Sequence, residues 1–223
     1  MNILIVSATQ FEVKPLLIFL EIENPVIGMN TTKKQPTYND IHVLITGVGM
    51  VNTAFMVGRY SQNNFDLALN VGVCGAFDKT IEIGQLVNVT NDIISEMGAE
   101  DGDDFITYDQ LDLGSTHQFI CNYNNSNNQI NSLKKVKGIT VNTIHGNELN
   151  IQKIKAIYNP DIESMEGAAF FAACNNNITN YLQIRAISNY VEKRDKSKWQ
   201  MPLAIKNLNE FLISLLNNEL KNN

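Results

Sequence analysis

The chain has 223 residues, of which 44% are hydrophobic and 18% are charged, and its formal net charge at pH 7 is −6. This composition is typical of a folded globular protein and argues against disorder, and the acidic balance argues against nucleic acid as a partner, because binding phosphates needs a basic face. There are 31 Asn but only three Arg, which leaves little for any function that needs several guanidinium groups.

A continuous apolar run predicts a strand over residues 2–7, followed by a helix from residue 10 with Thr9 as its N-cap and Glu12 in its first turn. The order of strand, glycine-containing turn and helix recurs at residues 41–61, and a further strand at 67–71 is expected to end in a glycine-rich loop at 72–76. The remaining elements are predicted as strands at 86–90, 138–144 and 181–187, and as helices at 148–157, 166–176 and 201–216.

Apolar strands that alternate with helices predict an α/β fold, in which a central mixed, largely parallel twisted sheet lies between helical layers. Neither a repeat nor a linker divides the chain, so residues 1–223 are expected to form a single three-layer α/β/α domain. Residues 100–135 are first acidic and then rich in Asn. They are predicted to form an irregular surface excursion, with a lid over a site as the alternative.

The cysteines and histidines argue against two kinds of site. The three cysteines are widely spaced and lie in or beside apolar runs, which favours reduced thiols over a disulfide framework. The three histidines show no ligand spacing, so neither a metal nor another cofactor is expected. With no long apolar segment and no basic leader, the sequence predicts a cytoplasmic protein that does not contact membranes.

Residues where strands end deserve attention, because ligands of open α/β sheets bind there. Considered singly, they have ordinary explanations. Glu12 and Glu166 suit the first turn of a helix, and Asn189 suits a turn. The glycines at 72–75 suit a tight turn, and they lack the spacing of a dinucleotide or triphosphate loop.

Together and in this order, these segments resemble the purine nucleoside phosphorylase and nucleosidase superfamily. The resemblance covers residues 3–215 apart from 100–135, and lies in the branch that contains methylthioadenosine/S-adenosylhomocysteine nucleosidase, with the futalosine hydrolases as the most similar subgroup. The segments that carry it are Thr9-Gln10-Phe11-Glu12, Thr46-Gly47-Val48-Gly49, Asn70-Val71-Gly72-Val73-Cys74-Gly75, Ser164-Met165-Glu166-Gly167-Ala168 and Arg185-Ala186-Ile187-Ser188-Asn189.

The resemblance implies hydrolysis of the N-ribosidic bond of a purine nucleoside. It implies that Glu166 holds the ribose 2′- and 3′-hydroxyls, that Met165 forms an apolar floor under the sugar, and that Glu12 activates the attacking water. The other residues expected to bind substrate are Gly72, Val73, Ile144, His145 and Arg194, the last as the cation for the benzoate that futalosine carries on its 5′ side. Trp199 and Phe105 are possible wall residues for that group.

Asn189 departs from the pattern of the adenine-cleaving members, in which an Asp stands at this place and protonates purine N7. An amide has no proton to give, but it can accept a hydrogen bond from a protonated N7 and donate one to a 6-oxo group. Asn189 therefore predicts a 6-oxopurine leaving group, and the resemblance implies cleavage of futalosine to hypoxanthine and dehypoxanthine futalosine in menaquinone biosynthesis. Val73 and Cys74 also differ from the Ser of the methylthioadenosine enzymes.

The shortage of Arg favours water over phosphate as the attacking group. The superfamily's phosphorylases hold phosphate with Arg on early loops, and between Ser7 and Val51 this chain has only Lys14, Lys33 and Lys34 as basic residues. Three alternatives stay open, namely a phosphorolytic enzyme, a methylthioadenosine/S-adenosylhomocysteine nucleosidase and a non-catalytic nucleoside-binding relative. A homodimer or higher homo-oligomer is expected by resemblance, with Val51, Phe55 and Val57 as candidates for the interface.

Overall fold

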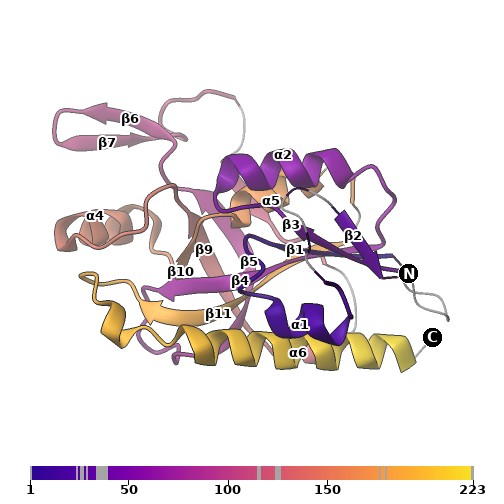
Figure 1. The fold of residues 1–223 in the computed structure, drawn as a ribbon. Helices are drawn as coiled ribbons and strands as arrows, with labels where there is room; N and C mark the ends of the chain where they lie inside the picture. Colours follow the sequence, from indigo (N-terminus) through magenta and orange to yellow (C-terminus); the bar gives the residue numbers. More distant parts are fainter. Residues whose placement is uncertain are drawn as a thin grey trace.

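A mixed sheet with helices on both sides forms the centre of the molecule (Figure 1). The computed structural model describes residues 2–221 except 24, 26, 27, 29, 34–39, 115, 116, 124–126, 176 and 179. The strands of this part of the chain are β1 (Ile3–Ser7), β2 (Asn30–Lys33), β3 (Ile41–Ile45), β4 (Leu67–Ala76), β5 (Leu86–Ile94), β6 (Gly98–Asp101), β7 (Asp104–Thr107), β8 (Gln118–Ile120), β9 (Lys134–Thr140), β10 (Ile162–Ser164) and β11 (Tyr181–Tyr190). The helices are α1 (Lys14–Phe19), α2 (Met50–Tyr60), α3 (Asn128–Asn131), α4 (Glu148–Tyr158), α5 (Gly167–Cys174) and α6 (Met201–Lys221), with a 3-10 turn at Lys196–Lys198.

The sheet confirms the predicted α/β fold with a mixed, largely parallel sheet. Its strands follow the order β10-β9-β5-β11-β4-β1-β3-β2, and β8 pairs with β5. The strands β3, β1, β4 and β11 are mutually parallel, whereas β5 and β2 run antiparallel to β11 and β3. Since β10 pairs with both β9 and β4, five strands form a closed ring at one end of the sheet.

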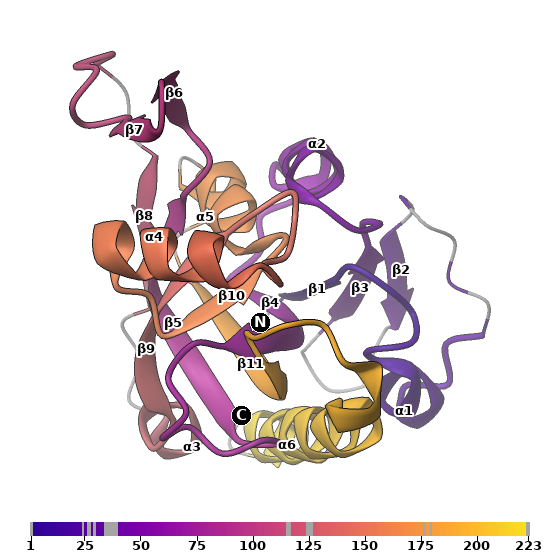
Figure 2. The same cartoon turned by 90° about the vertical axis from the view of Figure 1, so that its left-hand side faces the viewer.

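Two hydrophobic cores lie on opposite sides of the sheet. Leu16 of α1 and Leu208 of α6 belong to one core, and Val57 of α2 and Phe170 of α5 belong to the other. Figures 1 and 2 show the same division, with α1 and α6 on one side of the strands and α2 and α5 on the other. The central strands are buried on both faces, which explains why they appear as continuous apolar runs in the sequence.

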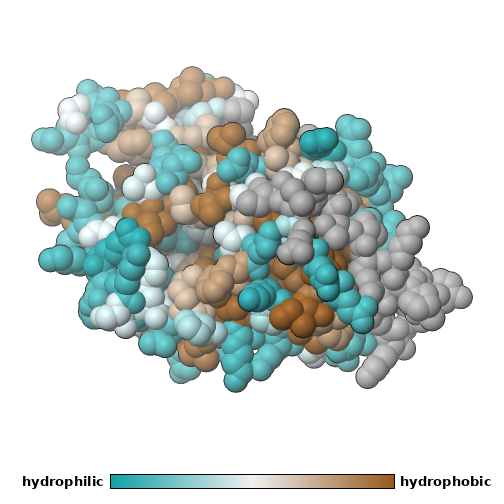
Figure 3. Space-filling view, viewed as in Figure 1, coloured by the Kyte–Doolittle hydropathy of each residue, from teal (hydrophilic) through white to brown (hydrophobic). Residues whose placement is uncertain are grey.

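The α2 helix corrects one expectation. Val57 is fully buried in the core, whereas Val51 and Phe55 are 80% and 63% exposed. A spacing of four residues places 51 and 55 on one helix face, and residue 57 falls on the opposite side. Val57 is therefore not part of an exposed apolar face. Hydrophobic side chains also reach the surface over α1 (Figure 3), where Ile18 and Phe19 are exposed.

Several predicted boundaries are wrong. Helix α1 begins at Lys14 rather than near residue 10, and Val13 rather than Thr9 takes the N-cap position. The segment 72–76 is not a loop but the second half of β4, because β11 and β10 pair with it on either side. The strand expected at 138–144 spans Lys134–Thr140 instead, which leaves residues 141–144 outside the sheet.

Residues 100–135 form more structure than a surface excursion. The hairpin of β6 and β7 projects beyond the sheet (Figure 1), while β8 pairs with β5. Part of the low-complexity run at 122–128 lies outside the described residues. Within the described part of the chain, no helix is both long enough and apolar enough to cross a membrane.

Candidate active site

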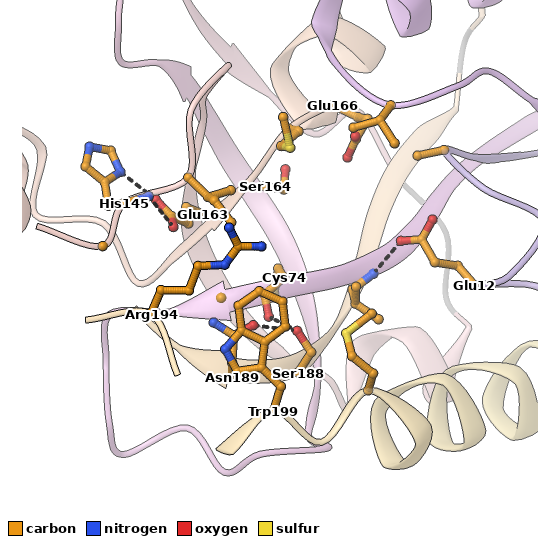
Figure 4. Close-up of a pocket in the computed structure, with 18 of the residues that line it drawn as sticks. Glu12, Cys74, His145, Glu163, Ser164, Glu166, Ser188, Asn189, Arg194 and Trp199 are labelled. Carbon is orange, nitrogen blue, oxygen red and sulfur yellow. Dashed lines mark hydrogen bonds and ion pairs between the residues drawn. The ribbon is translucent and has the colours of Figure 1, made fainter. Parts of the chain in front are cut away.

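A cavity of about 520 Å³ lies at the carboxyl ends of β1, β4, β10 and β11 (Figure 4). Of the nine residues that the sequence nominates, eight line this cavity, and Gly72 lies directly behind it. The nominated residues that line it are Glu12, Val73, Ile144, His145, Met165, Glu166, Asn189 and Arg194. Trp199 lines it as well, but Phe105 does not, and none of the other described residues of 100–135 does either.

Glu12 lies in the turn between β1 and α1, so it is not the acidic residue in the first turn of the helix that the sequence predicts. Its Oε2 accepts hydrogen bonds from the Thr9 hydroxyl at 2.9 Å and the Thr9 amide at 3.1 Å, and its Oε1 accepts one from the Val73 amide at 3.1 Å. The helix starts late because Pro15, which has no N–H, suits the first helical turn. These contacts fix a nearly buried carboxylate, 8% exposed, at the edge of the cavity.

Glu166 approaches the same end of the cavity from the residue that precedes α5. It makes no capping hydrogen bond to its own helix; instead its Oε1 accepts from the Gly49 amide at 3.1 Å. Gly49 has a φ of 99°, a left-handed conformation that glycine adopts without strain. Burial raises the pKa of Glu166 above its ordinary value, the nearby Glu12 adds to the rise, and Arg185 opposes it.

A chain of buried polar side chains lies behind Glu166. The Nη1 of Arg185 is 3.5 Å from Glu166 Oε2, its Nε donates to Gln183 at 2.8 Å, and its Nη2 donates to Asn70. Gln183 in turn donates to Asp92 at 2.8 Å. Arg185 is 1% exposed, so its charge is compensated within the protein rather than by water.

Asp92 ends this chain of contacts. It is fully buried on β5 and accepts a second hydrogen bond from the Thr140 hydroxyl at 2.8 Å. Burial raises its pKa to about 6, although Gln183, Thr140 and Arg185 each favour the ionised form. Arg185 lies in one of the motifs given above, without an expected role; an Arg between Ile184 and Ala186 in a predicted strand is the signal that could have found it.

Gly72 leaves room for the Glu12 carboxylate and the Arg185 guanidinium to lie close to the backbone of β4. A Cβ at this position would stand 2.5 Å from Arg185 Nη1 and 2.7 Å from Glu12 Oε1. Gly72 therefore contributes space rather than a contact. Since residue 72 lies inside β4, the requirement is close packing and not a tight turn.

Asn189 lies at the opposite end of the cavity, inside β11 rather than after it. The pairing of β11 with β4 shifts register between Ile187 and Asn189, and such a bulge redirects the side chains next to it. Asn189 Oδ1 accepts from the Ser188 hydroxyl at 2.8 Å, and Nδ2 donates to the Tyr190 carbonyl at 3.0 Å. One N–H and one lone pair of the amide remain for a ligand.

A second pair of side chains lines the wall near Asn189. Glu163, which the sequence reasoning missed, is 4% exposed and contacts His145 (Figure 4). The guanidinium of Arg194 stacks on Trp199, 5.5 Å from the ring centre, at the same end of the cavity. The strand β10 has only three residues, Ile162-Glu163-Ser164. Alternation of polar and apolar residues over so short a run predicts neither a strand nor that the Glu163 side chain faces the cavity.

A cysteine thiol also belongs to this wall. Cys74 lines the cavity, but burial raises its pKa to about 12, so it is a neutral thiol and not an activated nucleophile. All three cysteines are unpaired. Among the residues that the structure describes, no group of three His, Cys, Asp or Glu side chains could hold a metal ion.

The sequence and the fold both match known proteins. Residues 2–217 match the family described as the phosphorylase superfamily. A futalosine hydrolase of Thermus thermophilus is 27% identical over 190 residues, which cover 79% of this chain and 81% of that one. A futalosine hydrolase of Acidothermus cellulolyticus is 25% identical over 181 residues, 78% of this chain and 74% of that one.

Two solved structures from Helicobacter pylori share the fold at 17% identity. A futalosine hydrolase mutant superposes with a TM-score of 0.81 and covers 98% of this chain and 99% of its own. A 5′-methylthioadenosine/S-adenosylhomocysteine nucleosidase with a bound immucillin inhibitor superposes with a TM-score of 0.79 and covers 98% of both chains.

Proposed function

Because the chain belongs to the phosphorylase superfamily, we propose that it is a nucleosidase that hydrolyses the N-ribosidic bond of a 6-oxopurine nucleoside. The observation that carries the proposal is the layout of one cavity, with two buried carboxylates, Glu12 and Glu166, at one end and the amide of Asn189 at the other (Figure 4). The futalosine hydrolases among its relatives support the reaction class.

Glu166 suits the sugar because cleavage builds positive charge on the ribose ring. A carboxylate accepts two hydrogen bonds side by side, as the 2′- and 3′-hydroxyls require, and its charge attracts the developing cation. Burial leaves the Glu166 carboxylate poorly solvated and so raises its pKa, while Arg185 favours the ionised state. Met165 lines the cavity next to it and offers an apolar, polarizable surface under the ring.

Glu12 suits the attacking water. Thr9 and Val73 fix its two oxygens, so the carboxylate presents its remaining lone pairs in one orientation. A base held in this way would take a proton from water as the bond to C1′ forms, a contribution on the order of 10²- to 10⁴-fold in rate. The proton then resides on Glu12, the electrons of the broken bond go to the base, and N7 of the base takes its proton from solvent water.

Asn189 suits a 6-oxopurine as the leaving base. Its free N–H would donate to O6, and its free lone pair would accept from a protonated N7. Adenine would need the amide rotated, with its NH₂ directed at N7, which opposes the protonation that helps the base to leave. Hypoxanthine therefore fits this end better than adenine does.

Phosphorolysis is the second candidate, and the arginines argue against it. Arg185 is buried and committed to Glu166, Gln183 and Asn70, and Arg59 lies beside Tyr60 on α2. Arg194 is therefore the one arginine of the chain that lines the cavity. We propose water as the attacking group.

One assay tests the reaction and the substrate class together. Futalosine, inosine and methylthioadenosine are incubated with the enzyme, with and without phosphate, and the released base and sugar are identified. We expect hypoxanthine and a free sugar, unaffected by phosphate. A sugar 1-phosphate would establish phosphorolysis, and faster release of adenine would overturn the 6-oxopurine assignment.

Futalosine and menaquinone biosynthesis are the specific substrate and pathway that we propose, with Arg194 as the group that binds the 5′ benzoate. Arg194 lies at the Asn189 end of the cavity, where the base is placed, so the Arg194→Ala variant decides between a contact with the 5′ benzoate and a contact with the base. If Arg194 binds the benzoate, KM rises about tenfold or more for futalosine and stays unchanged for inosine. An equal rise for both substrates would place Arg194 at the base instead. A cytoplasmic location and a homo-oligomeric state complete the proposal.

A further inference from the structure

Glu163 is a buried carboxylate in the cavity wall that the roles assigned above leave unused. It lies on β10 and pairs with Gly75 of β4, and Asn189 of β11 pairs with the same glycine from the other side. A Cβ on Gly75 would stand 3.3 Å from Asn189 Nδ2 and 3.7 Å from Glu163 Cγ. The carboxylate and the amide therefore lie on either side of Gly75 on one face of the sheet, and Val191 Cγ2 packs 3.0 Å from the same position.

His145 holds Glu163 in place. The His145 amide donates to Oε1 at 3.1 Å, and ring atom Nδ1 lies 2.6 Å from Oε2. An ionised carboxylate only accepts hydrogen bonds, so the ring contributes an Nδ1–H here. Each oxygen keeps a lone pair, and at 4% exposure these acceptors are better satisfied by a ligand than by bulk water.

The two flanking groups match one edge of a 6-oxopurine. In its lactam form this base presents the donor N1–H beside the acceptor O6, whereas adenine presents the acceptor N1 beside a 6-amino donor. A carboxylate next to a donating amide complements the first pattern and opposes the second, because it would face the lone pair of adenine N1.

We propose that Glu163 is a specificity residue that accepts the N1–H of the 6-oxopurine while Asn189 donates to O6, with His145 as the residue that positions Glu163. The inference rests on the proposed function and deepens it, since two side chains on either side of Gly75 then distinguish hypoxanthine from adenine. Glu163 takes no part in the attack on the sugar, which occurs at the other end of the cavity.

The Glu163→Gln variant tests this assignment through a ratio of affinities. Binding of hypoxanthine and adenine to the wild type and the variant is measured by calorimetry. We expect hypoxanthine to bind at least about tenfold more weakly to the variant, because a neutral amide oxygen accepts the N1–H less strongly than a carboxylate, and adenine to bind equally or better. A glutamine amide can turn its NH₂ to N1 of adenine, whereas a carboxylate cannot. His145→Ala should shift the ratio in the same direction by a smaller factor.

Glu96→Gln is the matched control. Glu96 accepts from the Asn142 amide at 2.9 Å and the Thr143 amide at 3.2 Å, so it holds the same loop as Glu163 but lies outside the cavity wall. The Glu96→Gln substitution should leave the ratio of the hypoxanthine affinity to the adenine affinity unchanged. An equal change in both variants would show that loop order, and not the Glu163 carboxylate, sets the ratio, and would overturn the assignment.

The outcomes separate the two proposals. If the wild type prefers hypoxanthine and Glu163→Gln keeps that preference, the role of Glu163 is refuted and the proposed function stands. If the wild type prefers adenine, the proposed function itself is refuted. Should the variant not fold, the wild type is titrated with 1-methylhypoxanthine, which has no N1–H: binding at least tenfold weaker than that of hypoxanthine supports the role, and equal binding overturns it.

Discussion

Single atoms decide the geometry of this cavity, because its polar and charged side chains approach one another beside positions that have no side chain. Gly72 separates Glu12 from Arg185, and Gly75 separates Asn189 from Glu163. Both glycines lie on β4, so one strand provides the space at both ends of the cavity. Substitutions at these positions and at the side chains beside them should therefore change activity more than their size suggests.

Asn189→Asp should move the preference toward adenine. A carboxyl group at this place can carry a proton to N7 and accept from the 6-amino group, which an amide cannot do together. We expect the adenosine-to-inosine ratio of kcat/KM to rise at least tenfold. Asn207→Asp, outside the cavity on α6, is the control and should leave the ratio as it is. A ratio that stays constant or falls in Asn189→Asp would contradict the assigned contact.

Gly72→Ala should cost both stability and activity. The added Cβ would stand 2.5 Å from Arg185 Nη1, and overpacking of this kind costs about 1–3 kcal/mol in the free energy of unfolding. Displacement of Glu12 should lower kcat/KM more than tenfold. Gly58→Ala is the control: its Cβ meets no atom within 4 Å on α2, so it should stabilise by about 0.5–1 kcal/mol. Urea unfolding and initial rates measure the two effects, and normal activity in Gly72→Ala would be contrary to expectation.

At the scale of elements, the sequence predicts the strands that are continuous apolar runs. It does not predict those whose residues have low strand propensity and become strands only by pairing with their neighbours. Apolar runs mark β1 and β3 because both strands are buried on both faces. The second half of β4 contains two glycines, which have low strand propensity, and only its pairing with β10 and β11 makes it a strand. The same lack of local signal hid β10 and with it Glu163. The nominated residues lie in motifs that the resemblance marks, including Asn189 on the bulged strand β11, whereas Glu163 on the three-residue strand β10 lies in no such motif.

Asp92 connects these elements and should make stability depend on pH. The unfolded chain loses this proton near pH 3.8, whereas the folded protein holds it to about pH 6. Between these values the folded state binds more protons, so the free energy of unfolding falls as the pH rises, by roughly 3 kcal/mol. Chemical unfolding measured from pH 4 to 6.5 should show this slope in the wild type and lose it in Asp92→Asn. The exposed Asp101→Asn should keep it, and an unchanged slope in Asp92→Asn would disprove the assignment.

For the whole molecule, exposed apolar side chains suggest where copies of the chain meet. Val51 and Phe55 lie one turn apart on α2 and are 80% and 63% exposed. Patches of this kind on soluble proteins commonly mark an interface.

The double substitution Val51→Glu with Phe55→Glu should therefore convert an oligomer to a monomer, because it places two charges in an apolar contact. Size-exclusion chromatography with light scattering measures the mass. Leu149→Glu, at a 74% exposed apolar position on α4, is the matched control and should keep the oligomer. A wild type that is already monomeric would remove the basis for this expectation.

The buried polar chain from Glu166 through Arg185 to Asp92 implies a trade-off between the stability of the fold and the catalytic rate. Holding carboxylates in an apolar interior weakens the fold, as the raised pKa of both acids records, yet the same poorly solvated charge attracts a cationic sugar. Selection for thermal stability alone should therefore favour uncharged residues in place of these buried charged side chains. The resulting variants should unfold at higher temperature and have a lower catalytic rate.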